Sequence, residues 1–184
     1  MPVRPRVAQP GDMRGGFAAV QPMPWGGMGV RLVGEAISEL VFLPDGRGDV
    51  AASRHPLARE ACRQIAAYGR DAAFRFDLPL LLRGTPFQRS VWQAIAAVPR
   101  GRTRRYGEIA GELGSSARAV GQACGANRLP LVIPCHRVVA AGGIGGFAHH
   151  RDGYLLQAKR WLLAHEQPDL LQPGHQDQGA RPHG

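Results

Sequence analysis

The sequence centres on one stretch, Val132-Ile133-Pro134-Cys135-His136-Arg137-Val138-Val139, in which a cysteine stands between a proline and a histidine. The β-branched residues on both sides predict a strand that enters and leaves a packed core, with Cys135 at its edge. A cysteine attacks as a thiolate, and a neighbouring histidine can accept its proton. Most single cysteines are small buried hydrophobic residues, however, and on the Cys-His pair alone that interpretation comes first.

Composition and charge limit the class of protein. A chain of 184 residues with 44% hydrophobic content can form one domain or two small ones. Its formal net charge of +9 favours a polyanionic partner, without choosing among DNA, RNA and an anionic membrane. The three cysteines, Cys62, Cys124 and Cys135, lack the spacing of a disulfide framework or a metal site, which favours a reducing compartment. Because no apolar run approaches the roughly 18 residues of a membrane span, we expect a soluble, cytoplasmic protein.

The first part of the chain predicts a small α/β domain over residues 16–83. Short apolar segments separated by turn residues predict a meander of antiparallel strands, with its first turn at residues 24–27. Pro56 then opens a helical pattern that places Cys62 in the core. Apolar residues that alternate over 74–82 predict an extended segment that completes the domain.

A second domain is predicted over residues 84–168. Its first helix begins at Thr85-Pro86-Phe87-Gln88, where the threonine is the N-cap and the glutamine follows three residues later, and it should end at Pro99. Residues 154–166 repeat apolar side chains at helical spacing, with Asp152 as N-cap. The predicted fold class is therefore α/β, with antiparallel strands and a helix first and a mostly helical domain second.

The middle of the second domain has a helix-turn-helix pattern. A short helix over 107–113 is followed by a turn, by Ser116 as N-cap and by a second helix over 117–126. Arg118 is the only long charged side chain on this second helix, and the others are small. Such a surface suits close approach to a narrow groove, so we expect DNA binding with little sequence preference. Cys124 on the same helix is predicted to be a packing residue.

The densest positive charge lies just before this pattern. Residues 100–106 place four arginines around a turn. A charge run is often only solvated surface, so this turn is either a solvent-exposed loop or part of a surface that meets phosphates. The helix-turn-helix pattern that follows favours DNA.

Three segments show no helical or strand pattern. Residues 1–15 and 169–184 contain little that is apolar, and we expect disordered tails. The glycine-rich residues 140–147 lack the fingerprint of a dinucleotide site and the lysine of a phosphate loop. They are predicted to form a mobile wall of a pocket.

Taken together, the motifs of the second domain resemble the O6-alkylguanine-DNA alkyltransferases, the methylated-DNA-protein-cysteine methyltransferase family. The resemblance covers about residues 84–166, close to half of the chain, and the first domain is similar only loosely. Five motifs stand in the order of that family: Gly84-Thr85-Pro86-Phe87-Gln88 with Val91-Trp92, Tyr106-Gly107-Glu108-Ile109-Ala110, Arg118-Ala119-Val120-Gly121, Ile133-Pro134-Cys135-His136-Arg137-Val138 and Trp161-Leu162-Leu163-Ala164-His165-Glu166.

The resemblance implies direct-reversal DNA repair. Cys135 would take the alkyl group from guanine O6, with thymine O4 as a further candidate, and would be used once as S-alkylcysteine. His136 would deprotonate Cys135 through a water molecule, Glu166 would orient that histidine, and Asn127 would tie the recognition helix to the active-site turn. This fits the chemistry, because thiolates attack saturated carbon well and an extruded base can reach a buried sulfur. No cofactor is implied, and the zinc site of some members is not carried over, because this chain lacks the N-terminal cysteines that form it.

The implied partner is double-stranded DNA bearing O6-alkylguanine, bound by a monomer through the minor groove and without sequence preference. Arg118 would enter the duplex and fill the space of the extruded nucleotide. Tyr106 would push the neighbouring phosphate and donate a hydrogen bond to the flipped base. Arg105, Ser116 and Ala119 would lie on the same DNA-facing surface.

The base pocket is implied by the same resemblance. The backbone of Val138 would read the guanine edge, and Phe147 and Ala148 would belong to the loop that lines the alkyl pocket. Arg137 is expected to brace the turn. Arg128 stands where relatives carry proline, which is expected to loosen the turn.

Three alternatives remain at this stage. A sensor that binds alkylated DNA without transfer would carry another residue in place of Cys135. A helix-turn-helix regulator would need sequence-reading side chains that the small-residue helix lacks. A cysteine hydrolase would need Cys135 and His136 to touch directly, which adjacent residues at a strand end seldom do.

Overall fold

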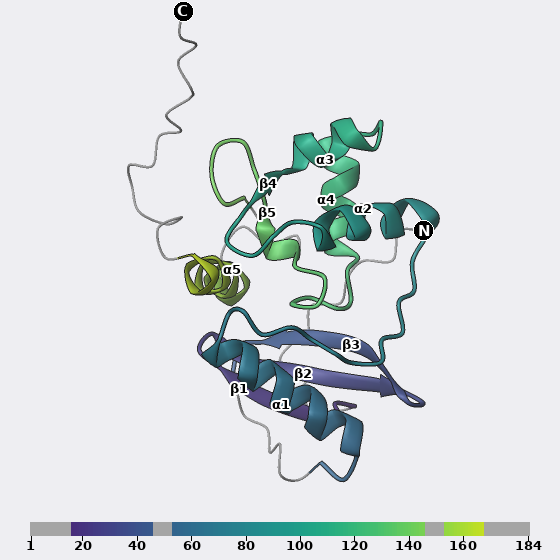
Figure 1. Cartoon of the computed structure of the whole chain (residues 1–184), viewed down its shortest axis with the longest axis vertical. Helices are drawn as coiled ribbons and strands as arrows, with labels where there is room; N and C mark the ends of the chain where they lie inside the picture. The colour runs from purple at the N-terminus through teal and green to yellow at the C-terminus, as the bar shows by residue number, and fades with distance from the viewer. Residues whose placement is uncertain (1–15, 46–52, 146–152, 168–184) are drawn as a thin grey trace, which may run out of the picture.

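The computed structural model describes residues 16–45, 53–145 and 153–167. The predicted tails, 1–15 and 169–184, lie outside these residues, as do Phe147, Ala148 and Asp152. Within the described part, no helix is long and apolar enough to cross a membrane. Figure 1 shows a small sheet with one helix along it, and a group of short helices above.

The sheet has three antiparallel strands in the order β1-β2-β3: β1 (Ala19–Met23), β2 (Gly26–Val33) and β3 (Ala36–Leu43). This confirms the predicted meander. Strand β2 begins inside the predicted turn, at Gly26. Only glycine fits there, because the φ is 137° and a Cβ would collide with the carbonyl of Leu43. Glycine thus lets β2 start directly after a two-residue turn.

Helix α1 (Pro56–Arg70) has proline in its first turn, as predicted, and packs its apolar side against the sheet. Ala58, Ala61, Cys62 and Ile65 on that side are fully buried. The prediction that Cys62 is a core residue is therefore confirmed.

The segment after α1 differs from a regular strand. Leu80 forms an isolated parallel bridge with Ile37, made by hydrogen bonds from the Ile37 amide to the Pro79 carbonyl and from the Leu81 amide to the Ile37 carbonyl, both 2.8 Å. Pro79 has no N–H to extend the ladder, which explains why the pairing stops there. Leu80 and Leu82 are 37% and 44% exposed, so their alternation in sequence does not reflect burial.

The second half is mostly helical. Its elements are α2 (Pro86–Ala96), β4 (Arg104–Arg105), α3 (Tyr106–Glu112), α4 (Ala117–Gly125), the 3-10 helix η2 (Cys135–Arg137), β5 (Val138–Val139) and α5 (Gly153–Glu166). Thr85 and Gln88 make both bonds of the predicted capping box, and α2 ends before Pro99 because Ala97 is already its C-cap. Ser116 caps α4 by accepting the Ala119 amide at 3.2 Å, so the predicted helix-turn-helix is present.

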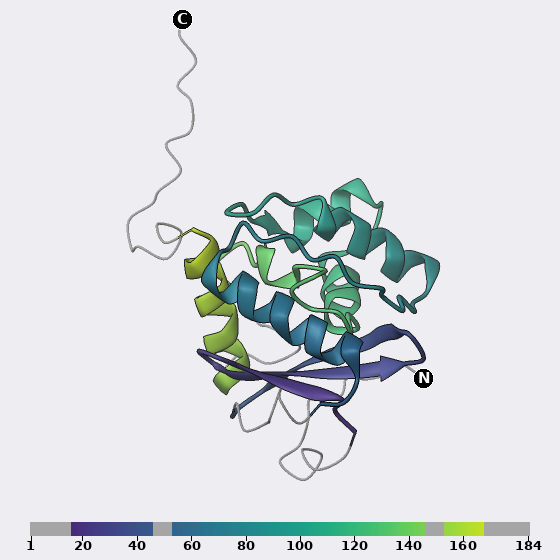
Figure 2. The same cartoon turned by 60° about the horizontal axis from the view of Figure 1, so that its bottom comes forward.

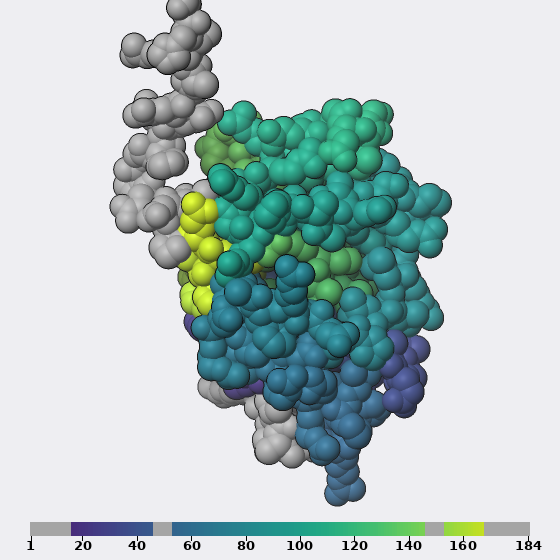
Figure 3. Space-filling view, viewed as in Figure 1, coloured from purple at the N-terminus to yellow at the C-terminus, as the bar shows by residue number. Residues whose placement is uncertain are grey.

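The two halves share one buried cluster. Helix α5 carries Trp161, whose ring lies 5.2 Å from that of Trp25 in the sheet region. Figure 2 shows α5 beside α1 and the sheet, and Figure 3 shows the second half stacked directly on the first. The α/β fold class is confirmed, while the domain boundary at residue 84 remains a prediction.

Candidate active site

Cys135 lies in a tight turn. The structure contradicts the strand predicted before it: residues 132–134 form no strand, Cys135 begins the 3-10 helix η2, and only Val138 and Val139 are extended. Two residues explain the turn. Pro134 has no N–H for a ladder, and Leu131 has a φ of 73°, in the left-handed region. Cys135 is 5% exposed.

The amide of Asn127 holds this turn and contacts the sulfur. Its Nδ2 lies 2.9 Å from Cys135 Sγ and donates to the Ile133 carbonyl at 2.9 Å, while its Oδ1 accepts the Leu129 amide at 2.9 Å. Asn127 follows Ala126, the C-cap of α4, so one side chain joins the end of that helix to the cysteine turn. An N–H group aimed at sulfur favours the charged thiolate over the thiol.

His136, which follows Cys135 in the chain, forms a buried pair with Glu166. His136 Nε2 lies 2.9 Å from Glu166 Oε1, and both side chains are 1% exposed. Burial lowers the pKa of His136, although Glu166 opposes that effect, so the imidazole is neutral at neutral pH. With Nε2 donating to the carboxylate, Nδ1 carries the lone pair and can accept a proton.

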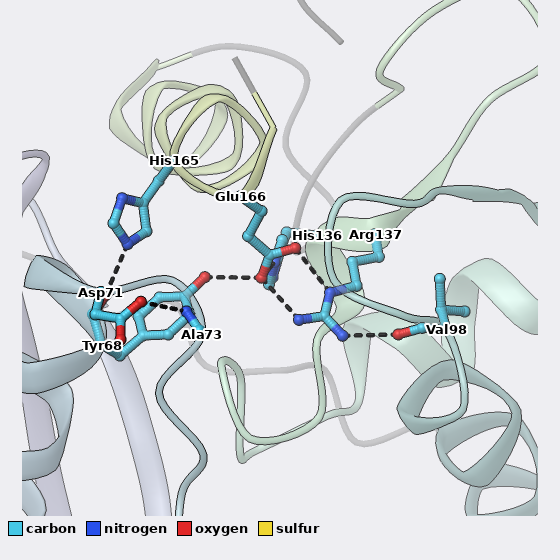
Figure 4. Close-up of polar contacts among 8 residues, drawn as sticks. All are labelled: Tyr68, Asp71, Ala73, Val98, His136, Arg137, His165 and Glu166. Atoms are coloured by element: carbon cyan, nitrogen blue, oxygen red, sulfur yellow. Dashed lines mark hydrogen bonds and ion pairs between the residues drawn. The ribbon is translucent and has the colours of Figure 1, made fainter. Parts of the chain in front are cut away.

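Glu166 is ionised despite its burial. Burial alone would raise its pKa, but hydrogen bonds from His136 and Arg137 hold the pKa well below its usual range. Arg137 donates from Nε to Oε2 and from Nη2 to Oε1, each at 2.8 Å, and from Nη1 to the Val98 carbonyl at 2.7 Å. Arg137 thus lies where a brace of the turn was expected. Figure 4 shows this group.

Sequence reasoning missed two polar residues of this site. The Tyr68 hydroxyl donates to Glu166 Oε1 at 2.9 Å. Lys159 is fully buried, donates to the Val138 carbonyl at 2.7 Å and lies 5.9 Å from the ring centroid of Tyr106. Lys159 could have been noticed in the sequence, because a lysine on the inward face of the last helix is unusual. Tyr68 could not, because it fits the apolar face of α1.

Burial also shifts the pKa values of the groups around the thiols. It lowers the pKa of Lys159 to about 8, against the opposing charges of Cys124 and Cys135. Burial, with Cys124 and Cys135 as further causes, raises the pKa of Tyr106 well above its usual range, so its phenol stays protonated. The Cys135 thiol faces the Cys124 carbonyl at 3.8 Å, which places helix α4 against the cysteine turn.

The predicted DNA-binding residues lie next to this site. Strand β4 pairs in parallel with β5, Arg104 with Val138 and Arg105 with Val139, and Tyr106 begins α3 directly after β4. Arg118 and Ser116 are exposed at the start of α4, Arg105 is exposed, and Ala119 and Tyr106 are half-buried. The short β4–β5 ladder therefore joins the helix-turn-helix to the cysteine turn.

The turn that contains Arg128 is tied to the sheet. The Leu40 amide donates to the Arg128 carbonyl at 2.8 Å, and the Arg128 guanidinium lies 3.8 Å from Glu39. The expected loosening is thus opposed by contacts with the first half of the chain. Among the described residues, no group of three or more His, Cys, Asp or Glu side chains could hold a metal ion.

Comparisons with known proteins identify relatives that share most of this fold. Residues 86–168 match the family described as 6-O-methylguanine DNA methyltransferase, DNA binding domain. The crystal structure of the Mycobacterium tuberculosis O6-methylguanine methyltransferase is 32% identical, with a TM-score of 0.62, over 81% of this chain and 91% of that one. The structure of Mycobacterium tuberculosis OGT in complex with DNA is 35% identical, with a TM-score of 0.64 and the same coverage.

Curated relatives agree over a shorter span. A methylated-DNA-protein-cysteine methyltransferase of Mycolicibacterium paratuberculosis is 46% identical over 109 residues, which are 58% of this chain and 63% of that protein. One of Methanosarcina acetivorans is 45% identical over 97 residues, 51% of this chain and 62% of that protein. The chain thus matches less than two thirds of the length of these curated relatives.

Proposed function

The chain belongs to the 6-O-methylguanine DNA methyltransferase family, and on that premise we propose that it repairs alkylated DNA by direct reversal. Cys135 takes the alkyl group from guanine O6 in a single displacement. The S–C bond forms as the C–O bond breaks, guanine leaves with the electron pair, and a proton completes the restored base. The observation that carries this proposal is the sulfur of Cys135, 2.9 Å from an amide donor and in the same turn as His136, which pairs with Glu166 of α5.

In this proposal, His136 is the base. A neutral imidazole with its lone pair on Nδ1 takes the proton of the Cys135 thiol through a water molecule. Glu166 stabilises the imidazolium that results, and Asn127 stabilises the thiolate by its N–H. The product is a thioether, which cannot be returned to a thiolate by this site, so each molecule reacts once.

We propose double-stranded DNA as the partner, approached by the helix-turn-helix from the minor groove. The formal charge of +9 supports binding to phosphates without sequence preference. Arg118 fills the space of the extruded nucleotide, while Arg105, Ser116 and Ala119 face the backbone. A protonated Tyr106 phenol suits the role of hydrogen-bond donor to the flipped base.

The base pocket in this proposal is formed around Val138; Phe147 and Ala148, which the resemblance adds to it, lie outside the described residues. The Val138 carbonyl is fixed by Lys159 at 2.7 Å, which gives the guanine edge a rigid acceptor. Because every proposed group comes from one chain, a monomer is sufficient for the reaction. The cytoplasmic location remains a prediction from the cysteine content.

The decisive experiment uses a duplex that contains one O6-methylguanine. After incubation with excess duplex, the peptide that carries Cys135 should gain the mass of one methyl group, once per molecule. A duplex with unmodified guanine should give no gain. Tight binding of the methylated duplex without any gain in mass would reject transfer and favour the sensor alternative.

The role of Arg118 has its own test. Arg118→Ala should lower the rate on methylated duplex about a hundredfold and leave the rate on free O6-methylguanine nearly unchanged, because a free base needs no extrusion. Arg59→Ala, which removes an exposed arginine from α1, is the matched charge control. Equal losses by Arg118→Ala on both substrates would reject the proposed role.

A further inference from the structure

Tyr68 is the one polar group from the first half of the chain that reaches the His136–Glu166 pair in the described residues. It lies on α1 and is 3% exposed. Its hydroxyl donates to Glu166 Oε1 at 2.9 Å, across 98 positions of sequence. Figure 4 shows the phenol pointing at the carboxylate from the side opposite Arg137. Every residue proposed above for the chemistry lies in the second half.

The hydrogen bonds fix Glu166 from three directions. Oε1 meets His136 Nε2 at 2.9 Å, Arg137 Nη2 at 2.8 Å and the Tyr68 hydroxyl at 2.9 Å. Oε2 accepts Arg137 Nε at 2.8 Å. Arg137 holds the carboxylate in the plane of its guanidinium, and Tyr68 closes the remaining side, so the carboxylate cannot turn away from His136.

Tyr68 itself is held firmly. His165 Nε2 lies 2.7 Å from the Tyr68 carbonyl, and the two rings meet edge to face at 5.3 Å. The ring of Phe76 lies 5.6 Å away. Burial, followed by the charge of Glu166, raises the pKa of Tyr68 far above its usual range, so the hydroxyl is protonated and can donate at neutral pH.

We propose that Tyr68 is a positioning residue of the transfer site: the first half of the chain supplies, through this hydroxyl, the hydrogen bond that keeps Glu166 aimed at His136. This inference rests on the proposed function, in which His136 is the base for Cys135. Its test measures the thiol alone and requires no DNA.

The test variant is Tyr68→Phe, which keeps the ring and removes the hydroxyl. Without that bond, Glu166 gains rotational freedom and stabilises the imidazolium less, so His136 accepts the proton of Cys135 less readily. The rate of Cys135 modification by iodoacetamide at pH 7 should fall about fivefold, less than the roughly tenfold or more expected for a direct hydrogen bond to a charged group, because the lost bond acts on Cys135 only through Glu166 and His136. The midpoint of its pH profile should rise by about half a unit or more. Peptide mass assigns the modified cysteine.

Two further variants separate positioning from packing. Gln64→Ala removes the hydrogen bonds between α1 and Asp77 but keeps the Tyr68 hydroxyl, and it should lower resistance to urea while leaving the midpoint unchanged. Tyr68→Leu should shift the midpoint as much as Tyr68→Phe does, with a larger loss of stability. A midpoint that is unchanged or lower in Tyr68→Phe would overturn the proposal. If instead the wild-type protein gains no methyl mass from DNA, the proposed function fails while this titration still reports on Tyr68.

Discussion

Two cysteines are buried in the two halves of the molecule, and their surroundings differ sharply. Cys62 on α1 is fully buried, and burial alone raises the pKa of its thiol to about 11. Cys135 is 5% exposed, yet an amide donor lies 2.9 Å from its sulfur and the His136–Glu166 pair follows in the chain. Because both thiols are buried, burial alone does not distinguish them. Cys135 differs from Cys62 by the amide donor at its sulfur and by its buried polar neighbours, and in the proposed function this difference makes Cys135 the reactive thiol.

The largest expected effect separates the two thiols directly. Cys135→Ala should reduce methyl transfer from O6-methylguanine duplex by more than about a thousandfold, because the attacking atom is lost. Cys62→Ala should transfer at the wild-type rate while it unfolds at lower urea, because a buried side chain is truncated. Transfer is measured as methyl mass on the protein. Residual methylation of Cys135→Ala at another cysteine would break the comparison.

The next largest effect compares two amide side chains, Asn127 at Cys135 and Gln64 near Cys62. Asn127→Ala removes the N–H from the Cys135 sulfur, and transfer should fall about tenfold to a hundredfold, as expected for a bond to a charged group. The matched control lies near Cys62, where Gln64 donates to the Asp77 carbonyl and accepts the Asp77 amide, both at 2.8 Å. Gln64→Ala should lower stability and leave transfer unchanged. Equal transfer losses in the two variants would show that Asn127 acts only through the fold.

The sequence predicted those features that depend on neighbouring residues. The capping box of Thr85 and Gln88, the N-cap Ser116 and the core position of Cys62 are all short-range patterns, and the structure confirms them. The strand predicted before Cys135 was wrong, because β-branched residues favour extension but Pro134 and the left-handed Leu131 turn the chain. Tyr68 could not be predicted, since helical periodicity shows only that it faces inward and its partner lies 98 positions away.

The smallest expected effects are two opposite dependences of stability on pH. Lys159 has a pKa of about 8 in the folded protein and 10.5 as its ordinary value, so the unfolded chain binds more protons in that window. Stability should therefore rise with pH from about 8 to 10.5, by about 1 kcal/mol per unit at most. Cys62 has the opposite sign: its folded pKa of about 11 lies above its ordinary 9.0, so its contribution falls as pH rises from 9 to 11.

Each pH dependence is isolated by subtracting the free energy of unfolding of a variant from that of the wild type. Urea unfolding of the wild type and of Lys159→Met should give a stability difference that increases with pH above 8. The same measurement with Cys62→Ala should give a difference that decreases above pH 9. Two slopes of the same sign would contradict the contrast between a buried cation near Cys135 and a buried neutral thiol at position 62.

The hydrogen bond from Tyr68 to Glu166 also bears on the order in which the molecule forms. The bond spans 98 positions, and the bond from Glu166 to His136 spans 30. Contacts between distant positions carry a larger loop-closure cost than a helix or a hairpin, so they form late as a chain folds. The strands and α1 can gather early, whereas the carboxylate reaches His136 only after α5 has docked. We therefore expect the proposed site, in which His136 accepts the proton of Cys135, to be completed late in folding.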